Sequence, residues 1–340
     1  MKAIGFSTSL PIDDEKSLFA FETETPTPGP RDLLVRVRAV SVNPVDCKQR
    51  LRAAVDTVLD TPKILGYDAS GVVEAVGSAV SLFKPGDAVY YAGSIKRQGT
   101  NAEFHLVDER IAGHKPASLS DAEAAALPLT SLTAWEVLFD RMRIAEGDGL
   151  SNTAGKTLLI IGGAGGVGSV AIQLAEQLTG LHVIATASRQ ETARWCRELG
   201  AEEIADHHDL VASVRNLGHQ HVDSILCTND FAAHWPAIAE LIGPQGSIGS
   251  ILGAPQLDVG QLMGKSVSLS WELMFTRSSF ETDDMIEQHR ILERVAELVN
   301  DGRLRTTLSE TLDGFTAANH RQAHRMVEAG RMIGKAVITY

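Results

Sequence analysis

The segment 156–189 constrains the fold of this chain more than any other part. Two apolar runs, at 157–161 and 181–186, flank a glycine-rich turn and an alanine-rich helical pattern. Short apolar runs bounded by glycine are typical of buried strands, so this order predicts a strand, a tight turn, a helix and a second strand. Strand and helix patterns continue to alternate as far as residue 252. This alternation predicts an α/β domain with a parallel sheet and helices on both of its faces.

The glycine-rich turn carries the pattern G-x-G-x-x-G at Gly163, Gly165 and Gly168. Between a strand and a helix, this pattern indicates dinucleotide binding. The glycines allow a tight turn, a close approach of the backbone to a pyrophosphate, and close packing of the helix on the strand. The phosphates then lie at the helix N-terminus. We predict that Gly163, Gly165, Gly166, Val167 and Gly168 bind the cofactor; the alternative is a glycine-rich turn without a ligand.

The end of the second apolar run distinguishes NADPH from NADH. An NAD site has an acidic residue there, about 20 residues after the glycines, that binds the ribose 2′-hydroxyl. This chain has Thr186, Ser188 and Arg189 in that region, and its first acidic residue is Glu191. Hydroxyl groups followed by arginine suit a 2′-phosphate, because guanidinium and phosphate form paired hydrogen bonds. We predict NADPH rather than NADH, with Arg194 as a further contact, unless both arginines are solvated helix residues.

Charge and cysteine content restrict the partners and the compartment. The net charge of −12 disfavours nucleic acid and anionic membranes as partners, because like charges repel. The cysteines Cys47, Cys196 and Cys227 have no C-x-x-C spacing, so neither a disulfide framework nor a thiolate zinc knuckle is predicted. The N-terminus has no apolar stretch long enough for a signal peptide. We expect a cytoplasmic protein that binds neither nucleic acid nor a membrane.

The first 130 residues predict a β-rich antiparallel module, because short apolar and β-branched runs at 33–40, 71–77 and 87–91 are separated by turns containing proline and glycine. Helices are expected where this module ends. Ser120 and Glu123 form a capping box that predicts a short helix ended by Pro128, and a second helix is predicted at 131–141.

Beyond about residue 270 the alternation of strands and helices stops. An amphipathic helix is predicted at 285–299 and a last strand at 335–340. We expect this tail to return to the first module, so that the nucleotide-binding domain is an insertion and the active site lies in the cleft between the two domains.

A set of motifs extends in order along nearly the whole chain. They are Ser41–Asp46 with Arg50, Gly66–Gly77, Lys84–Val89, Leu129–Ala134, the glycine pattern, Glu198–Ala201 and Gly334–Val337. With these motifs the chain resembles the medium-chain dehydrogenase/reductase superfamily, in its zinc-independent quinone oxidoreductase-like branch. The segment 270–277 resembles a bacterial subgroup called zinc-type alcohol dehydrogenase-like. The resemblance implies a Rossmann nucleotide-binding domain, 131–270, inserted in a β-rich GroES-like catalytic domain, 1–130 completed by 271–340.

The zinc ligands of the superfamily are replaced in this chain. Zinc members carry a cysteine where this chain has Asn43 and a histidine where it has Tyr67. Catalytic zinc needs three protein ligands, and the cysteines with an unsupported histidine do not supply such a set. We therefore expect no zinc. The pairs His207–His208 and His219–His221 are interpreted as exposed loop residues without a metal.

Without a metal to polarise a carbonyl, hydrogen-bond donors must stabilise the oxyanion that hydride transfer creates. The resemblance implies that Tyr67 directs its hydroxyl into the active-site cleft. In the alternative, Tyr67 packs beneath the nicotinamide with its hydroxyl bonded to the backbone.

The resemblance also implies further cofactor contacts. Asn43 and Thr130 resemble residues near the nicotinamide ribose, where they would relay a proton or orient the ring. His207 resembles a residue near the adenosine end, and Leu252–Gly253 and Lys335 resemble segments that close over the cofactor.

Other polar and aromatic residues have expected supporting roles. We expect Asp46 and Arg50 to form an ion pair that braces the loop after Asn43. Trp271 and its neighbours at 274–275 would suit the wall of an apolar pocket, or equally packing between domains or subunits.

A donor-lined site without metal favours acceptors that are already activated. The sequence therefore predicts an NADPH-dependent, zinc-independent reductase of quinones or α,β-unsaturated carbonyls, including enones and 2-alkenals. The alternatives are a zinc-type alcohol dehydrogenase or carbonyl reductase and a non-catalytic NADPH-binding protein. Homodimers are usual in the family, and Val267 to Trp271 would be a plausible edge strand for pairing.

Overall fold

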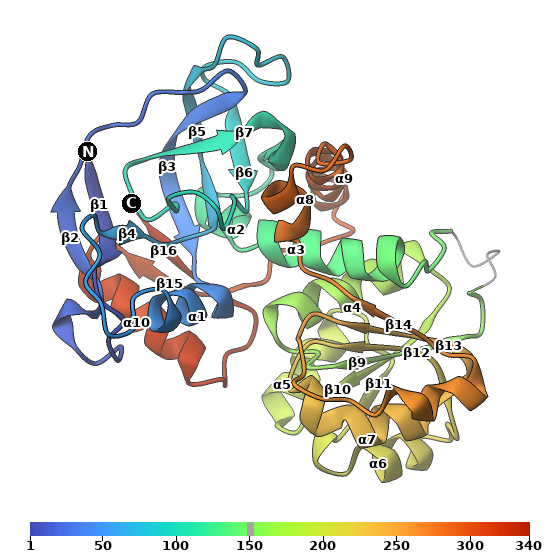
Figure 1. Ribbon diagram of the computed structural model, residues 1–340. Coiled ribbons are helices and arrows are strands. Elements are labelled where there is room, and N and C mark those ends of the chain that lie inside the picture. The colour runs from blue at the N-terminus through green and yellow to red at the C-terminus, as the bar shows by residue number, and fades with distance from the viewer. Residues whose placement is uncertain (148–152) are drawn as a thin grey trace. The chain divides into compact units, whose positions relative to one another are not determined.

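A computed structural model describes residues 1–147 and 153–340 (Figure 1). The chain divides into two compact units. Unit 1 comprises residues 1–129 and 275–340, and unit 2 comprises residues 130–274. The chain thus leaves unit 1, builds unit 2 and returns, which confirms the predicted insertion of one α/β domain into a β-rich one.

Unit 2 contains a sheet with the strand order β11-β10-β9-β12-β13-β14, and all of its pairs are parallel. The order changes direction at β9, and such a switch point is where doubly wound sheets bind dinucleotides. Every residue of β9 is buried, as expected of a strand covered on both faces. The strands are β9 (Thr157–Ile161), β10 (His182–Thr186), β11 (Glu203–Ala205), β12 (Val222–Cys227), β13 (Ile242–Ser250) and β14 (Ser268–Trp271).

Helices of unit 2 connect these strands and confirm the predicted alternation. They are α4 (Gly166–Leu178), α5 (Gln190–Glu198), α6 (Leu210–Asn216) and α7 (Phe231–Leu241), with short 3-10 segments η4 (His207–Asp209) and η5 (Val259–Lys265). The apolar side chains of β9, β12 and β13 pack with those of α6 and α7 into one core.

The helices before unit 2 differ in detail from the prediction. The capping box is confirmed, because the Ser120 hydroxyl accepts from the Glu123 backbone N–H at 3.3 Å and begins α2 (Asp121–Ala125). Pro128 does not simply end that helix; it begins the next one, α3 (Pro128–Trp135). Proline suits the first helical position because its missing N–H would have no partner there. The helix then continues as a π-helical segment, η3 (Glu136–Arg141).

Unit 1 is built on a seven-stranded sheet with the path β15-β16-β3-β5-β6-β8, and β7 pairs with β3. The last strand, β16, pairs antiparallel with β3, so the tail completes a sheet that the first residues begin. The strands are β3 (Asp32–Ser41), β5 (Asp68–Val76), β6 (Ala88–Tyr91), β7 (Phe104–Asp108), β8 (Ala112–His114), β15 (Leu308–Asp313) and β16 (Lys335–Thr339).

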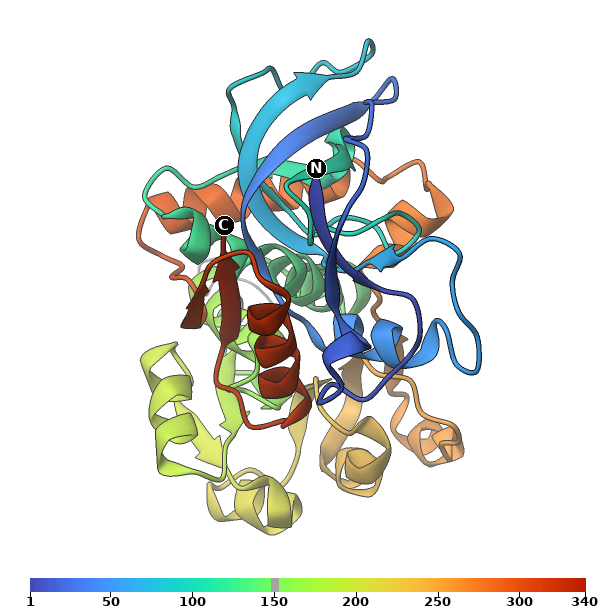
Figure 2. The ribbon, with the colours of Figure 1, turned by 90° about the vertical axis from the view of Figure 1, so that its left-hand side faces the viewer.

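A small second sheet and several helices complete unit 1. The sheet has the order β2-β1-β4, with β1 (Lys2–Phe6), β2 (Phe19–Glu22) and β4 (Lys63–Ile64). The helices are α1 (Pro44–Arg52), α8 (Phe275–Phe280), α9 (Glu287–Asn300) and α10 (Ala317–Glu328), and the 3-10 segments are η1 (Glu15–Ser17) and η2 (Glu109–Ile111). Helix α10 lies beside β15 and β16 (Figure 2). Among the described residues, every helix is too short or too polar to serve as a transmembrane segment.

Candidate active site

The glycine turn of unit 2 connects β9 to the N-terminus of α4. A Cβ atom on Gly163 would lie 2.8 Å from the Ala185 Cβ, and one on Gly168 would lie 2.8 Å from the Gly163 Cα. These two glycines are therefore required by the packing of the helix and the strands. A Cβ on Gly165 would meet nothing closer than the Gly162 carbonyl oxygen at 3.4 Å. The protein alone could accommodate alanine at 165, and the space beside this glycine fits a pyrophosphate that approaches the backbone closely.

The N-terminus of α4 has the properties of an anion site. Gly165 is its N-cap residue, and no side chain caps the helix there. The first N–H groups of the helix, including those of Gly166 and Val167, have no acceptor within the helix. Together with the helix dipole they attract a phosphate. The residues present therefore fit a dinucleotide cofactor.

The residues predicted to select NADPH lie directly after β10. The Thr186 hydroxyl accepts a hydrogen bond from the Gly162 N–H at 2.9 Å, so it also supports the glycine turn. Ser188 is exposed, and the partly exposed Arg189 forms an ion pair with Glu191 at 2.7 Å. Exposed ion pairs are weak, so a phosphate could replace that carboxylate.

Arg194 lies further along α5 and is 82 % exposed. It pairs with Glu198 one helical turn away, at 2.7 Å. Its side chain is therefore available to a ligand, although it has no feature beyond that of an ordinary surface arginine.

The histidines of unit 2 are only partly as expected. His208 and His221 are exposed, but His207 and His219 are half-buried, so the interpretation of all four as exposed loop residues was wrong. His207 stacks on His208 with 4.2 Å between ring centroids. Burial is the main cause that lowers the pKa of His207, and the charge of His208 is the second. His219 contacts Glu203 at 2.7 Å, which explains its position against the sheet.

The segment after β13 was predicted to close over the cofactor. The Ser250 hydroxyl accepts from the Leu252 N–H and donates to the Leu252 carbonyl, both at 3.1 Å, which fixes the turn. Gly253 is exposed, and a Cβ there would meet no atom within 4 Å. Thr130 belongs to the same unit and is buried in the first turn of α3.

In unit 1, a buried network joins Asn43, Asp68 and Lys335. The Lys335 ammonium donates to Asp68 Oδ2 at 3.1 Å, to the Asn43 side-chain oxygen and to the Val42 carbonyl oxygen at 3.3 Å. The Asn43 side-chain N–H donates to the same Asp68 oxygen at 2.8 Å, and the Leu129 N–H donates to the other at 2.7 Å. Both oxygens of Asp68 are therefore satisfied, and a fixed cation lies beside it.

This network does not fit a catalytic zinc ion. The oxygen of Asn43 that could coordinate a metal already accepts from Lys335, and the Asp68 carboxylate is paired with the same ammonium. Catalytic zinc sites use thiolate, imidazole or carboxylate ligands around the metal, whereas here the positive charge is supplied by a lysine. Lys335 thus bonds directly to Asn43, which replaces one zinc ligand of the superfamily, and to Asp68, which follows the other replaced position, Tyr67, in the chain.

Asp46 does not pair with Arg50, so that expectation was wrong. The Asp46 carboxylate is fully buried and accepts from the Asn43 N–H at 2.8 Å and the Gly66 N–H at 2.9 Å. It holds the start of α1 against the loop before Tyr67. Burial raises the pKa of Asp46 to about 7, although both N–H groups and the Lys335 charge act in the opposite direction. Arg50 points to other partners on a different part of unit 1.

Tyr67 has a buried ring that packs on Phe275, with 4.9 Å between the centroids. Within residues 1–147 and 153–340, its hydroxyl has no hydrogen bond and is not among the buried polar atoms that lack a partner. The hydroxyl therefore contacts solvent. Burial is the main cause that raises the pKa of Tyr67, and the charge of Asp46 is the second. The phenol therefore keeps its proton and can donate a hydrogen bond.

Of the aromatic and apolar residues at 271–275, only some suit a pocket wall. Met274 and Phe275 are buried, and Phe275 contacts Tyr67. Trp271 is 51 % exposed at the end of the edge strand β14.

The sequence reasoning missed Asp68, which is the centre of the buried network. Its signal was present, because Asp68 follows Tyr67 within the recognised motif. What could not be seen was its pairing with Lys335, which is 267 residues away in the chain.

Comparisons with known proteins agree with this architecture. The family model of the alcohol dehydrogenase GroES-like domain matches residues 29–121, and that of the zinc-binding dehydrogenases matches residues 199–338. A zinc-type alcohol dehydrogenase-like protein of Staphylococcus aureus is 42 % identical over 99 % of this chain and 99 % of its own. The word zinc in these names describes the matched family and the matched protein.

Solved structures are similar over the whole chain. A crystal structure from Rhizobium etli, named as a candidate zinc-dependent alcohol dehydrogenase, is 51 % identical with a TM-score of 0.94, covering 100 % of this chain and 98 % of that one. The quinone oxidoreductase from Coxiella burnetii is 27 % identical with a TM-score of 0.79, covering 100 % and 99 %. The chain is therefore an oxidoreductase of the medium-chain dehydrogenase/reductase superfamily and belongs to its quinone oxidoreductase-like branch.

Proposed function

We propose that this protein is an NADPH-dependent, zinc-independent reductase of quinones or α,β-unsaturated carbonyls such as enones and 2-alkenals. The observation that supports the proposal is the Lys335 ammonium, which is bound by Asp68 and by Asn43, the residue at one of the replaced zinc-ligand positions. Such a site has no metal to lower the pKa of an alcohol. A conjugated acceptor needs only hydrogen-bond donors for the charge that it delocalises onto oxygen.

Unit 2 is assigned the binding of the cofactor. When bound, NADPH supplies the hydride. The N–H groups at the start of α4 bind the pyrophosphate, and Gly165 leaves room for it. Arg189 binds the 2′-phosphate by exchanging Glu191 for it. Thr130 is assigned the positioning of the nicotinamide ribose, and His207 and Leu252–Gly253 are assigned contacts along the cofactor.

Unit 1 is assigned the stabilisation of the reacting oxygen. The Tyr67 hydroxyl donates a hydrogen bond to the carbonyl oxygen as that oxygen becomes negative. Because its pKa is raised, the phenol keeps its proton, and the product receives its proton from water. Asn43 is held by Lys335 and Asp68, so its side chain is rigid enough to orient the nicotinamide ring.

Turnover by the Tyr67→Phe variant tests this assignment. With NADPH and 9,10-phenanthrenequinone or 2-hexenal, the wild-type protein should oxidise the cofactor without added metal. Loss of the hydroxyl should lower kcat by about 10²- to 10³-fold, as for other oxyanion donors, with little change in cofactor affinity. Tyr90→Phe is the matched control, because the Tyr90 hydroxyl bonds the Leu292 carbonyl elsewhere in the unit. Tight NADPH binding without turnover on a broad acceptor panel would favour a non-catalytic binding protein instead.

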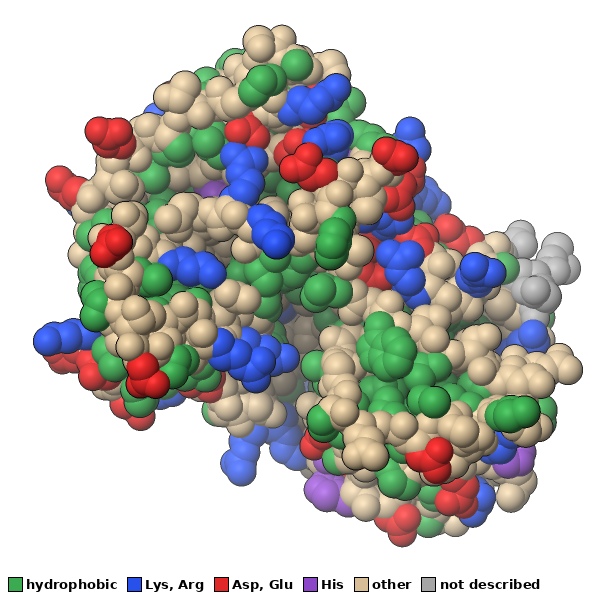
Figure 3. All heavy atoms as spheres, viewed as in Figure 1, with side chains coloured by type: hydrophobic (Ala, Val, Ile, Leu, Met, Phe, Trp, Pro, Cys, Tyr) green, Lys and Arg blue, Asp and Glu red, His purple; other side chains and the backbone are tan. Residues whose placement is uncertain are grey.

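The edge strand β14 supports a further proposal, namely a homodimer formed through unit 2. Hydrophobic side chains gather on the face of unit 2 that carries β14 and η5 (Figure 3). Trp271, Leu273 and Met263 are among the exposed large apolar residues, and exposed apolar patches mark interaction sites. Light scattering should give a dimer mass for the wild type and a monomer mass for Trp271→Glu; a monomeric wild type would exclude this assembly.

A further inference from the structure

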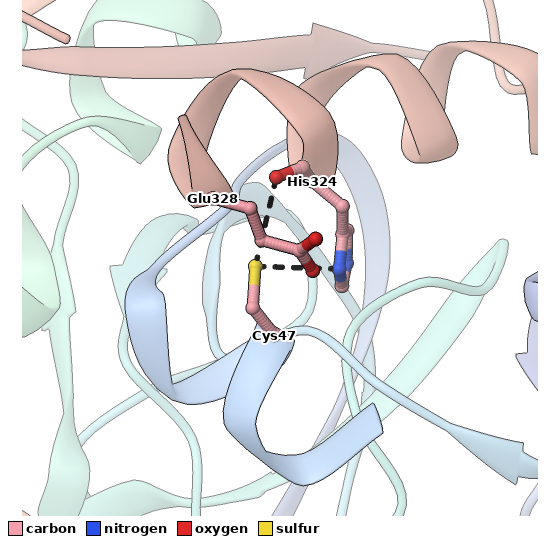
Figure 4. A group of neighbouring side chains, drawn as sticks. All are labelled: Cys47, His324 and Glu328. Atoms are coloured by element: carbon pink, nitrogen blue, oxygen red, sulfur yellow. Dashed lines mark hydrogen bonds between the residues drawn. The ribbon is translucent and has the colours of Figure 1, made fainter. Parts of the chain in front are cut away.

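Three side chains capable of binding a metal meet between α1 and α10 in unit 1 (Figure 4). Cys47 comes from α1, and His324 and Glu328 come from α10, where a spacing of four residues places both on one face. The two helices are in contact. One ligand atom from each of the three residues lies within 4.8 Å of the others.

The separation of the sulfur and the imidazole matches a tetrahedral metal site. Zinc lies about 2.3 Å from a cysteine sulfur and about 2.0–2.1 Å from a histidine nitrogen, which places the two ligand atoms about 3.5 Å apart at a tetrahedral angle. Cys47 Sγ and His324 Nδ1 are 3.5 Å apart. Thiolate, imidazole and carboxylate together form a donor set that binds zinc or cobalt in preference to magnesium or calcium.

The two ring nitrogens of the fully buried His324 have different surroundings. Nδ1 faces Cys47 Sγ and is the nitrogen that would bind the metal, whereas Nε2 has no hydrogen-bond partner among the described residues. The cost of burying this polar ring is therefore not offset by a full set of hydrogen bonds.

Glu328 and Arg50 provide access and orientation. The Glu328 side chain is 27 % exposed, whereas that of Arg50 is fully buried, so an ion could reach the site from the side of Glu328. One Glu328 carboxylate oxygen is paired with the Arg50 guanidinium, which also donates to the Leu10 carbonyl oxygen. Ligating carboxylates are commonly held by such a second hydrogen bond. The positive charge of Arg50 weakens cation binding, but its ion pair with the Glu328 carboxylate offsets part of this repulsion.

We propose that Cys47, His324 and Glu328 bind a divalent transition-metal ion, with Zn²⁺ as the best match and a fourth position left for water. Binding displaces the thiol proton to solvent, so the metal is held by a thiolate. The site shares no residue with the Lys335 network, and its metal links α1 to α10 without taking part in hydride transfer. The inference does not depend on the proposed function.

Metal content and a cobalt spectrum test the proposal on the full chain. Untagged protein is stripped with a chelator, dialysed against Zn²⁺ and analysed by plasma mass spectrometry, and should retain stoichiometric zinc. Titration with Co²⁺ should produce thiolate-to-cobalt charge-transfer absorption in the near ultraviolet. Cys47→Ser should abolish this absorption, and Glu328→Gln should weaken the affinity by about 10- to 100-fold.

Matched controls keep the result interpretable. Cys196→Ser removes another buried cysteine and should leave both the zinc content and the cobalt absorption unchanged. Circular dichroism establishes that each variant is folded, which is needed for Glu328→Gln because Glu328 pairs with the buried Arg50 guanidinium. Absence of metal binding in the wild type, or cobalt absorption that persists in Cys47→Ser, would overturn the proposal.

Discussion

At the scale of single residues, the buried charge of Lys335 distinguishes this site from a metal centre. Its ammonium and the Asp68 carboxylate are both buried, and Asn43 bonds to each of them. Burying an ion pair costs desolvation energy, and the cost is offset only when the remaining hydrogen-bonding capacity is satisfied. Asp68 meets that condition because Leu129 donates to its second oxygen.

Replacing Lys335 by methionine should destabilise the protein by about 3–5 kcal/mol, because Asp68 would be left as a buried charge without its partner. The measurement is the free energy of unfolding in urea. Lys84→Met is the control, since Lys84 is 81 % exposed in its pair with Asp87 and should cost less than about 1 kcal/mol. Equal effects of the two substitutions would show that the Lys335 pair is not a buried one.

Asp46 should make stability depend on pH. The folded protein holds the Asp46 proton up to about pH 7, whereas the ordinary pKa of an aspartate is 3.8. Between these values the folded state binds more protons, so the contribution of Asp46 to stability falls as the pH rises and is constant above about 7. The free energy of unfolding of the wild type, relative to Asp46→Asn, should therefore decrease between pH 4 and 7. A difference that does not change with pH in this window would contradict the raised pKa.

At the scale of elements, the three glycines of the turn between β9 and α4 differ in the space around them. Gly163 and Gly168 lie where a Cβ would collide with neighbouring strands or backbone, whereas Gly165 has room for one. Packing therefore requires Gly163 and Gly168, and we propose that Gly165 leaves room for the cofactor.

Gly165→Ala should therefore leave the melting temperature nearly unchanged and weaken NADPH binding by about tenfold or more, which corresponds to about 1.4 kcal/mol. Gly163→Ala should lower the melting temperature, because the new methyl group would contact Ala185 at 2.8 Å. Calorimetric titration with NADPH and a thermal scan give both quantities. Unchanged affinity in Gly165→Ala would place the pyrophosphate elsewhere.

The start of α5 should determine the choice of nicotinamide cofactor. Arg189→Ala should weaken NADPH by about 10- to 100-fold, since a hydrogen bond to a charged group contributes about 1.5–3 kcal/mol, and should leave NADH binding unchanged. Arg215→Ala is the control, because Arg215 forms a comparable exposed pair with Glu240 on other helices of unit 2. Equal losses for both cofactors would remove Arg189 from the 2′-phosphate site.

Local patterns predicted the elements that they encode directly. The strand predicted at 157–161 has its observed bounds, and that predicted at 181–186 differs by one residue. Helices α1 and α10 were not predicted, because α1 begins at a proline within a motif and α10 carries mostly polar residues. The glycine turn could be found because its residues are contiguous. The Asp68–Lys335 pair and the Cys47–His324 contact join opposite parts of the chain, which no local pattern reveals.

At the scale of the whole molecule, we propose that unit 2 binds the cofactor and that unit 1 stabilises the reacting oxygen of the acceptor. On this proposal both units are needed for turnover, and the Tyr67 hydroxyl receives the charge that hydride transfer creates. A bound zinc ion between α1 and α10 is compatible with this account, because it would stabilise unit 1 without contacting the reacting atoms.

The most direct test is the rate of NADPH oxidation by untagged protein before and after removal of zinc by a chelator. With 9,10-phenanthrenequinone or 2-hexenal as acceptor, we expect the same kcat/KM in both states, whatever zinc content is measured. Loss of activity with the metal, and its recovery when Zn²⁺ is restored, would contradict the account.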